Sequence, residues 1–114
     1  MNSINVKTMP SFNYFEVEGS LENDELIKLQ SDIDYQMHYG SKHFLFDISK
    51  LKNLNSSAIR IFVRTQKQLK LVDGLLFLLS PTKTINELLQ MSELIELLRV
   101  KEDMHDAISE LNLS

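Results

Sequence analysis

The chain has 114 residues, 43% of them hydrophobic and 25% charged, which suits one globular domain rather than a disordered segment. A formal net charge of -4 argues against a general nucleic-acid surface, because phosphate binding needs an excess of basic residues. The lack of cysteine excludes disulfides, thiolate catalysis and cysteine-ligated metals, and it is compatible with a reducing compartment, so we expect a cytoplasmic protein.

The N-terminal third of the sequence predicts two strands followed by a helix. β-Forming residues in Phe12–Leu21 predict one strand, and an earlier strand around Ile4–Met9 is expected to pair with it. From Asn23, a residue type that caps helices, apolar residues recur at helical spacing until Gly40, which can adopt the left-handed conformation that ends a helix. The expected buried face of this helix consists of Leu26, Leu29, Ile33 and Met37.

Two mostly apolar runs in the middle of the chain predict strands covered on both faces. These runs are Phe44–Ile48 and Leu75–Leu79. A polar loop over Ser49–Asn55 is expected to lead into a helix over Ser56–Asp73, with Gly74 at the point where that helix stops. The alternation of strand and helix predicts parallel neighbours in one sheet.

The C-terminal third predicts a helix, a short edge strand and a last helix. The first helix follows Pro81 and is expected to begin with a capping box of Thr84 and Glu87. Leu97–Val100 is short enough for an edge strand. The last helix is marked by Met104, Ala107, Ile108 and Leu111. We therefore predict a single α/β domain over residues 1–114, with a mixed β-sheet of about 4–5 strands packed with about 4 helices.

The sequence lacks the common catalytic and ligand-binding motifs. Its three glycines stand alone at element boundaries and form no glycine-rich phosphate cradle. No serine lies in a Gly-x-Ser-x-Gly elbow, and the three histidines, which are His38, His43 and His105, have no metal-ligand spacing. No apolar run approaches the ~20 residues that a membrane-spanning helix needs. We expect no enzyme activity, no cofactor, no metal site and no membrane span.

The start of the helix at Ser56 carries the main functional signal. Backbone N–H groups are unpaired at a helix start and the helix dipole is positive there, so a phosphate on Ser56 or Ser57 is electrostatically tolerated. The basic residues that follow Ser56 on one helical face are Arg60, Arg64 and Lys67. This spacing leaves a second interpretation open, in which the serines only cap the helix and the basic face is solvated surface.

Several short segments occur together in a recognisable order. They are Gly19-Ser20-Leu21, Asp47-Ile48-Ser49, Asn55-Ser56-Ser57-Ala58, Leu88, Leu98-Arg99-Val100 and residues 102–107. In this order the sequence resembles the STAS domain family, specifically the bacterial anti-sigma factor antagonists, over nearly the whole chain. In that family the helix start reads Asp-Ser-Ser/Thr-Gly, so this chain departs from the pattern at Asn55 and Ala58.

The resemblance implies a partner-switching role in transcription regulation. An unphosphorylated domain of this type binds an anti-sigma factor that is also a serine kinase, and phosphorylation of the first serine of the motif breaks the complex. Ser56 matches that serine, and Ser57 is the second choice. The residues expected to bind the partner are Asn55, Ser56, Ser57, Ala58, Arg60 and Arg64.

Two other functions remain open beside partner switching. The departures from the motif favour an adaptor that is not phosphorylated, as some STAS domains are accessory subunits of transport systems. Binding of a small ligand or nucleotide rests on analogy with the fold alone.

Overall fold

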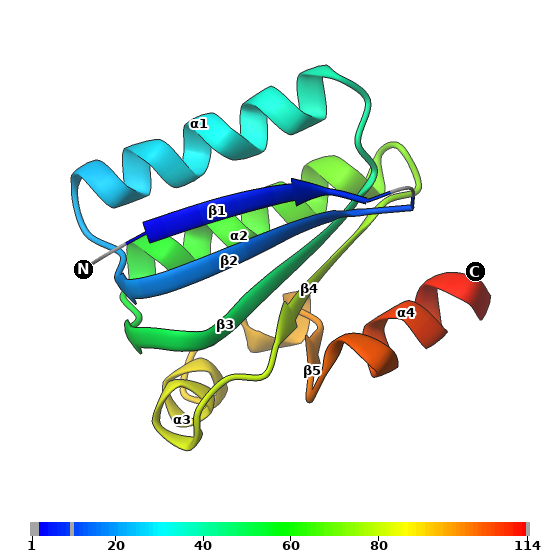
Figure 1. Ribbon diagram of the computed structural model, residues 1–114. Helices are drawn as coiled ribbons and strands as arrows, with labels where there is room; N and C mark the ends of the chain where they lie inside the picture. Colours follow the sequence, from blue (N-terminus) through cyan, green and yellow to red (C-terminus); the bar gives the residue numbers. More distant parts are fainter. Residues whose placement is uncertain (1–2, 10, 114) are drawn as a thin grey trace.

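The structure is a computed structural model that describes residues 3–9 and 11–113. Over these residues it contains a five-stranded sheet in the order β1-β2-β3-β4-β5, with β1 antiparallel to β2 and every other pair parallel (Figure 1). The strands are β1 (Ser3–Thr8), β2 (Asn13–Ser20), β3 (His43–Asn53), β4 (Leu75–Leu79) and β5 (Val100–Lys101). The helices are α1 (Asp24–His38), α2 (Ser56–Lys70), α3 (Lys83–Gln90) and α4 (Met104–Leu113). The predicted mixed α/β architecture is confirmed.

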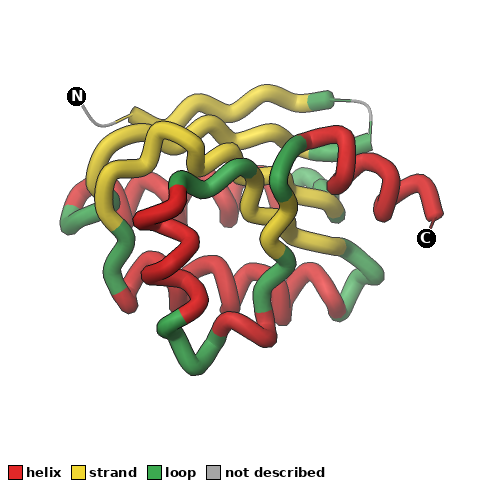
Figure 2. The backbone as a smooth tube through the Cα atoms, turned by 90° about the horizontal axis from the view of Figure 1, so that it is seen from below, coloured by secondary structure: helices red, strands yellow, loops and turns green. Residues whose placement is uncertain are grey.

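The sheet is covered unequally on its two faces. Because β2 to β5 follow one another in the same direction across the sheet, right-handed crossovers place α1, α2 and α3 together on one face. Buried side chains of these three helices join the main core, whereas α4 packs on the opposite face through a smaller cluster around Ala107. Figure 2 shows the helical layer below the strands in that view and the C-terminal helix apart from it.

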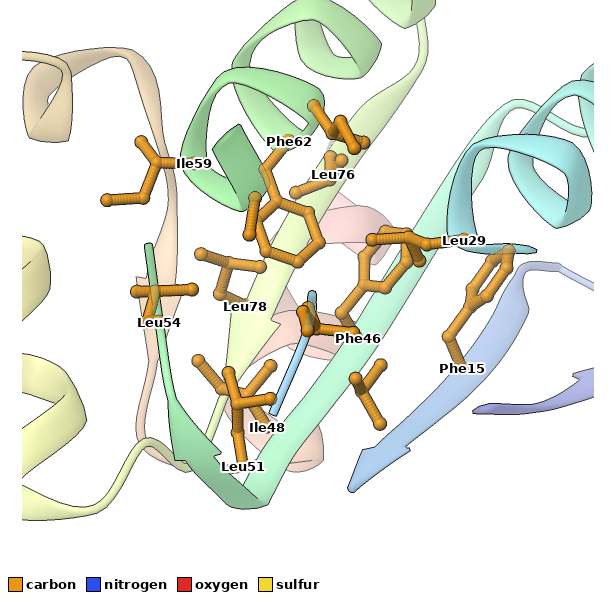
Figure 3. Close-up of a cluster of buried hydrophobic side chains, with 14 of the residues drawn as sticks. Phe15, Leu29, Phe46, Ile48, Leu51, Leu54, Ile59, Phe62, Leu76 and Leu78 are labelled. Carbon is orange, nitrogen blue, oxygen red and sulfur yellow. The ribbon is translucent and has the colours of Figure 1, made fainter. Parts of the chain in front are cut away.

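The main core contains four phenylalanine rings, of which Figure 3 labels Phe15, Phe46 and Phe62. Phe15 of β2 stacks on Phe46 of β3 with ring centroids 4.3 Å apart, and Phe46 meets Phe62 of α2 edge-on at 5.1 Å. All three side chains are fully buried. Aromatic pairs in these geometries add about 0.5–1.5 kcal/mol each to the gain from burial, so this contact holds α2 firmly on the sheet.

Strand β3 is longer than the sequence suggested. The predicted loop over Ser49–Asn55 continues as strand as far as Asn53. Lys50 and Leu51 pair with the end of β2, and the backbone hydrogen bonds of a parallel ladder do not depend on side-chain polarity. The polar side chains of this part lie at the surface while Leu51 is buried. Polarity was therefore a poor indicator of a loop here.

One predicted helix cap is wrong, and another occupies the expected position without a capping hydrogen bond from its side chain. Thr82, rather than Thr84, caps α3, because its hydroxyl accepts a hydrogen bond from the N–H of Ile85 at 3.2 Å. Asn23 precedes α1 but makes no side-chain capping hydrogen bond. Its backbone instead adopts φ 44° and ψ -107°, in a turn that a hydrogen bond from the Glu25 N–H closes. A positive φ at a non-glycine residue stores conformational strain.

The end of α2 also differs from the prediction. The helix stops at Lys70 rather than at Asp73, and Asp73 itself takes the left-handed conformation, with φ 60°. Gly74 is required for another reason, since a Cβ atom there would overlap the carbonyl oxygen of Lys42. Gly40, with φ 85°, does have the expected left-handed conformation after α1.

The fifth strand begins later than expected. Of the predicted strand over Leu97–Val100, Leu97 closes a 3-10 turn, and β5 itself comprises only Val100 and Lys101. Leu98 is buried, and its N–H binds the Ile95 carbonyl rather than a neighbouring strand. None of the helices in residues 3–9 and 11–113 is long and apolar enough to cross a membrane.

Candidate functional site

The candidate site is the first turn of α2, which follows β3 at the carboxyl-terminal edge of the parallel strands (Figure 1). Asn55 makes the turn from strand to helix with an extended backbone. Its side-chain oxygen accepts a hydrogen bond from the Ala58 N–H at 2.9 Å, and its side-chain nitrogen donates to the Leu21 carbonyl at 3.0 Å. One amide thus caps α2 and ties the helix start to the segment that follows β2.

The two serines of the motif are accessible. Ser56 and Ser57 are the first residues of α2, and both are exposed. The first turn of α2 contains no acidic residue, so a negative group on either hydroxyl meets the positive end of the helix dipole without a neighbouring carboxylate on the helix. This arrangement is chemically suited to a phosphate.

The predicted basic face of α2 is present. Ser56, Arg60, Arg64 and Lys67 are all exposed, as their helical spacing requires. The opposite face is buried in the main core and includes Ile59, Phe62 and Val63. Within the described part of the chain, no ion pair involves any basic residue of α2. The face therefore presents unneutralised positive charge.

Ala58 does not belong to this exposed surface. Its side chain has 0% exposure and packs in the main core, so it is not available to a docked protein. The third helical position of α2 faces the sheet, whereas the first two positions face outward. Of the residues expected to bind a partner, Asn55 is half-buried, and the exposed ones are Ser56, Ser57, Arg60 and Arg64.

Asp47 lies within β3 rather than at its end, and it forms a polar cluster that the sequence reasoning missed. The Tyr14 hydroxyl donates to one carboxylate oxygen at 2.8 Å, and the Ser49 N–H donates to the other at 2.9 Å. Burial by itself raises the pKa of Asp47, but the hydrogen bonds from Ser49 and Tyr14 and the charge of Lys50 lower it below its ordinary value. Burial and then the hydrogen bond to Asp47 raise the pKa of Tyr14.

The histidines and acidic residues form no metal site in the part of the chain that the structure covers. His43 has a structural role, because its Nδ1 accepts a hydrogen bond from the Leu75 N–H at 3.2 Å. Burial, and to a lesser extent the charge of Lys42, lowers the pKa of His43. These groups sit at the amino-terminal ends of β3 and β4, away from Ser56.

Comparisons with known proteins agree with this geometry. The family model described as the STAS domain matches residues 3–107. Among solved structures, the anti-sigma factor antagonist SpoIIAA in its unphosphorylated form aligns with a TM-score of 0.82 and 17% identity over 98% of each chain. The Bacillus protein SpoIIAA in the phosphorylated form aligns with a TM-score of 0.73 and 17% identity, over 96% of this chain and 99% of that one.

A third similar structure is an anti-sigma-factor antagonist (STAS) domain protein from Planctomyces limnophilus. It has a TM-score of 0.80 and 21% identity, over 97% of this chain and 98% of that one. At these identities the likeness establishes a shared fold. A comparison of the sequence with curated proteins gave no match.

Proposed function

The chain belongs to the STAS domain family, and from this premise we propose that it is an anti-sigma factor antagonist that acts by partner switching in the bacterial cytoplasm. In this proposal, the unphosphorylated protein binds an anti-sigma factor with serine kinase activity and thereby frees a sigma factor. Phosphorylation of Ser56 then dissociates the complex. The domain itself carries out no catalysis.

The observation that carries the proposal is the exposure of Ser56 at the start of α2, on the same face as Arg60 and Arg64. A kinase can reach this hydroxyl without unfolding the helix. A phosphate there adds a charge of about -1.5 to -2 at neutral pH. Placed one helical turn before Arg60, it competes with any acidic group of the partner for the same guanidinium group. Phosphorylation therefore changes the docking surface without a change of fold.

The test combines peptide mapping with binding measurements on purified proteins. The chain is recovered from its native cells, its bound protein is identified, and residues 55–64 are mapped by mass spectrometry for phosphate. We expect Ser56→Asp to abolish binding of that protein and Ser56→Ala to retain it, because only the first substitution adds negative charge. Ser31→Asp places the same charge on the exposed surface of α1 and serves as the matched control. Equal binding by Ser56→Asp and Ser56→Ala contradicts the switch.

A constitutive adaptor, such as an accessory subunit of a transport system, is the second candidate function. The departures at Asn55 and Ala58 favour it, because they alter the helix start that a family kinase would recognise. This function predicts a stably bound partner without an ATP-binding domain, and no phosphate on Ser56 under any growth condition. The mapping experiment separates the two functions directly.

A further inference from the structure

A groove beside the C-terminal half of α2 is not used by the proposed switch. It lies between α2 and the segment that precedes β5, and its volume is about 380 Å³. We call it the α2–β5 groove, and the residues that matter to its chemistry are Lys67, Lys70, Leu75, Leu97, Leu98 and Arg99. Its position follows from the brevity of β5, which pairs only with Leu78 and Leu79 of β4.

The first residues of β4 therefore have no strand partner on the groove side. The side chain of Gln66 takes the place of one, because its oxygen accepts a hydrogen bond from the Leu76 N–H at 2.8 Å. This hydrogen bond satisfies one backbone donor on the exposed edge of β4 and so limits unspecific pairing of another strand there. What remains accessible is a depression between α2 and the 3-10 turn.

Leucine side chains supply the apolar surface of the groove. Leu98 is buried and Leu75 is half-buried, while Leu97 is 45% exposed although it is a large aliphatic residue. Leu97 lies on the 3-10 turn, directly before Leu98, so its exposure is imposed by the turn. A partner that covers Leu97 and the exposed part of Leu75 gains the free energy of apolar burial.

Basic residues surround this apolar surface. Lys67 and Lys70 lie on the α2 side and are exposed, and neither forms an ion pair with another described residue. Arg99 lies on the other side and shares the carboxylate of Glu110 with Lys101, at 3.1 and 2.9 Å. Glu96 is the acidic residue among those that line the groove. The groove thus has a positive rim in a chain whose formal net charge is -4.

We propose that the α2–β5 groove binds an acidic segment of a partner protein that carries apolar side chains. The apolar side chains cover Leu97 and Leu75, and the carboxylates pair with Lys67 and Lys70. The leucine floor favours a protein segment over nucleic acid, whose binding sites combine basic residues with aromatic stacking. The formal net charge of the chain is negative, so outside the groove the protein surface is repelled by an anionic membrane.

This site is separate from the switch at Ser56. Lys67 follows Ser56 by eleven positions along the helix, or about 16.5 Å along the axis, which exceeds the Debye length of about 8 Å at physiological salt. Phosphorylation of Ser56 therefore has little direct electrostatic effect on the groove. The inference goes beyond the proposed function and does not require it.

The experiment uses the full chain labelled with nitrogen-15 and a short fluorescent peptide rich in glutamate, with two leucines one helical turn apart. We expect saturable binding, with the largest amide shifts at residues 66–70 and 95–99. The double substitution Lys67→Glu and Lys70→Glu should weaken binding at least about tenfold, since it replaces attraction by repulsion at the rim. Leu97→Ser should weaken it at least about threefold, through the loss of apolar contact.

The matched control is the double substitution Lys52→Glu and Lys83→Glu, which changes the net charge equally at exposed sites outside the groove. This control should change the affinity for the peptide by less than about twofold, because salt screens charges that lie outside the groove. Equal weakening by the control, or amide shifts elsewhere, overturns the proposal. So does tighter binding of a DNA duplex or of vesicles containing phosphatidylserine through the same lysines.

Ser56→Asp distinguishes this proposal from the proposed function. It should dissociate the anti-sigma partner and leave peptide binding at the groove within about twofold, given the separation of the two sites. If Ser56→Asp does not dissociate the anti-sigma partner, the peptide titration still tests the groove. If the peptide does not bind, the proposed switch at Ser56 is unaffected. Circular dichroism of each variant establishes that it is folded before binding is compared.

Discussion

At the scale of single residues, the carboxylate of Asp47 shows how a polar group is held between the buried residues Phe46 and Ile48. Donors reach it from Tyr14 on the neighbouring strand and from Ser49 two residues along its own strand. The lowered pKa of Asp47 means that the folded protein favours the ionised form. Its contribution to stability is therefore complete above the ordinary pKa of 3.8 and is lost as the pH falls through the lower value in the folded state.

Tyr14→Phe tests this cluster. At pH 7 we expect the free energy of unfolding to fall by about 1–2 kcal/mol, because a hydrogen bond to a charged acceptor is lost. Without the Tyr14 hydroxyl the pKa of Asp47 moves back toward its ordinary value, so the difference between variant and parent should shrink as the pH drops below about 4. Urea unfolding at a series of pH values measures both effects.

Urea unfolding at alkaline pH provides a second test of the same hydrogen bond. The pKa of Tyr14 is raised in the folded protein, so its contribution to stability is complete below the ordinary value of 10.0 and is lost as the pH rises from there through the higher pKa of the folded state. The parent should lose this contribution and Tyr14→Phe should not. Tyr35→Phe, on the exposed surface of α1, is the matched control and should unfold like the parent. A constant difference at every pH would contradict the proposed role of the hydrogen bond.

At the scale of elements, the start of α2 depends on one amide that both accepts and donates. An aspartate at position 55 still accepts from the Ala58 N–H, and its charge favours the helix dipole. It has no hydrogen to donate to the Leu21 carbonyl, and it places a negative oxygen against that oxygen. Asn55, which departs from the family motif, is therefore able to make both hydrogen bonds at this helix start, whereas an aspartate is not.

Asn55→Asp and Asn55→Ala measure the two roles of the amide separately. We expect Asn55→Ala to lower the free energy of unfolding by about 2 kcal/mol, since both hydrogen bonds are lost. Asn55→Asp should cost about 1 kcal/mol at pH 7, and less near pH 4, where the protonated acid regains a donor. Thermal unfolding at both pH values provides the measurement. A stabilising Asn55→Asp would show that the Leu21 contact contributes little.

At the scale of the whole molecule, the two faces of the sheet differ in the amount of core they bury. The face under α1, α2 and α3 carries the contacting rings of Phe15, Phe46 and Phe62 and most of the buried side chains. Among the helices of residues 3–9 and 11–113, α4 is the one that covers the other face, over a small cluster that includes Leu45, Phe77 and Ala107. Local stability follows the number of buried apolar contacts, so α4 is expected to open without the rest of the fold.

Native-state hydrogen exchange tests this difference. Amides in α4 should exchange through openings whose free energy is lower than that of global unfolding, whereas amides in residues 61–69 of α2 should require global unfolding. Ala107→Gly, which lowers helix propensity by about 1 kcal/mol, should accelerate exchange in α4 about fivefold more than exchange in α2. If α4 exchanges only at the global rate, the two faces form one cooperative unit.

The order of the elements and the exposed face of α2 followed from the sequence, because hydrophobic periodicity depends only on local geometry. The apolar residues that it marked in α1 do pack against the main core, and the basic residues that it marked in α2 are exposed. The same local patterns explain why a chain with two strands followed by alternating helices and strands was readable as a mixed sheet.

Tertiary structure alone decided the points at which chain segments meet. Pairing with β2 extended β3 through polar residues, and the close approach of Lys42 required Gly74. The burial of Ala58, the link from Asn55 to Leu21 and the groove left by the short β5 likewise depend on contacts between residues distant in sequence. A sequence pattern reports what one segment prefers, whereas these features arise from what another segment places beside it.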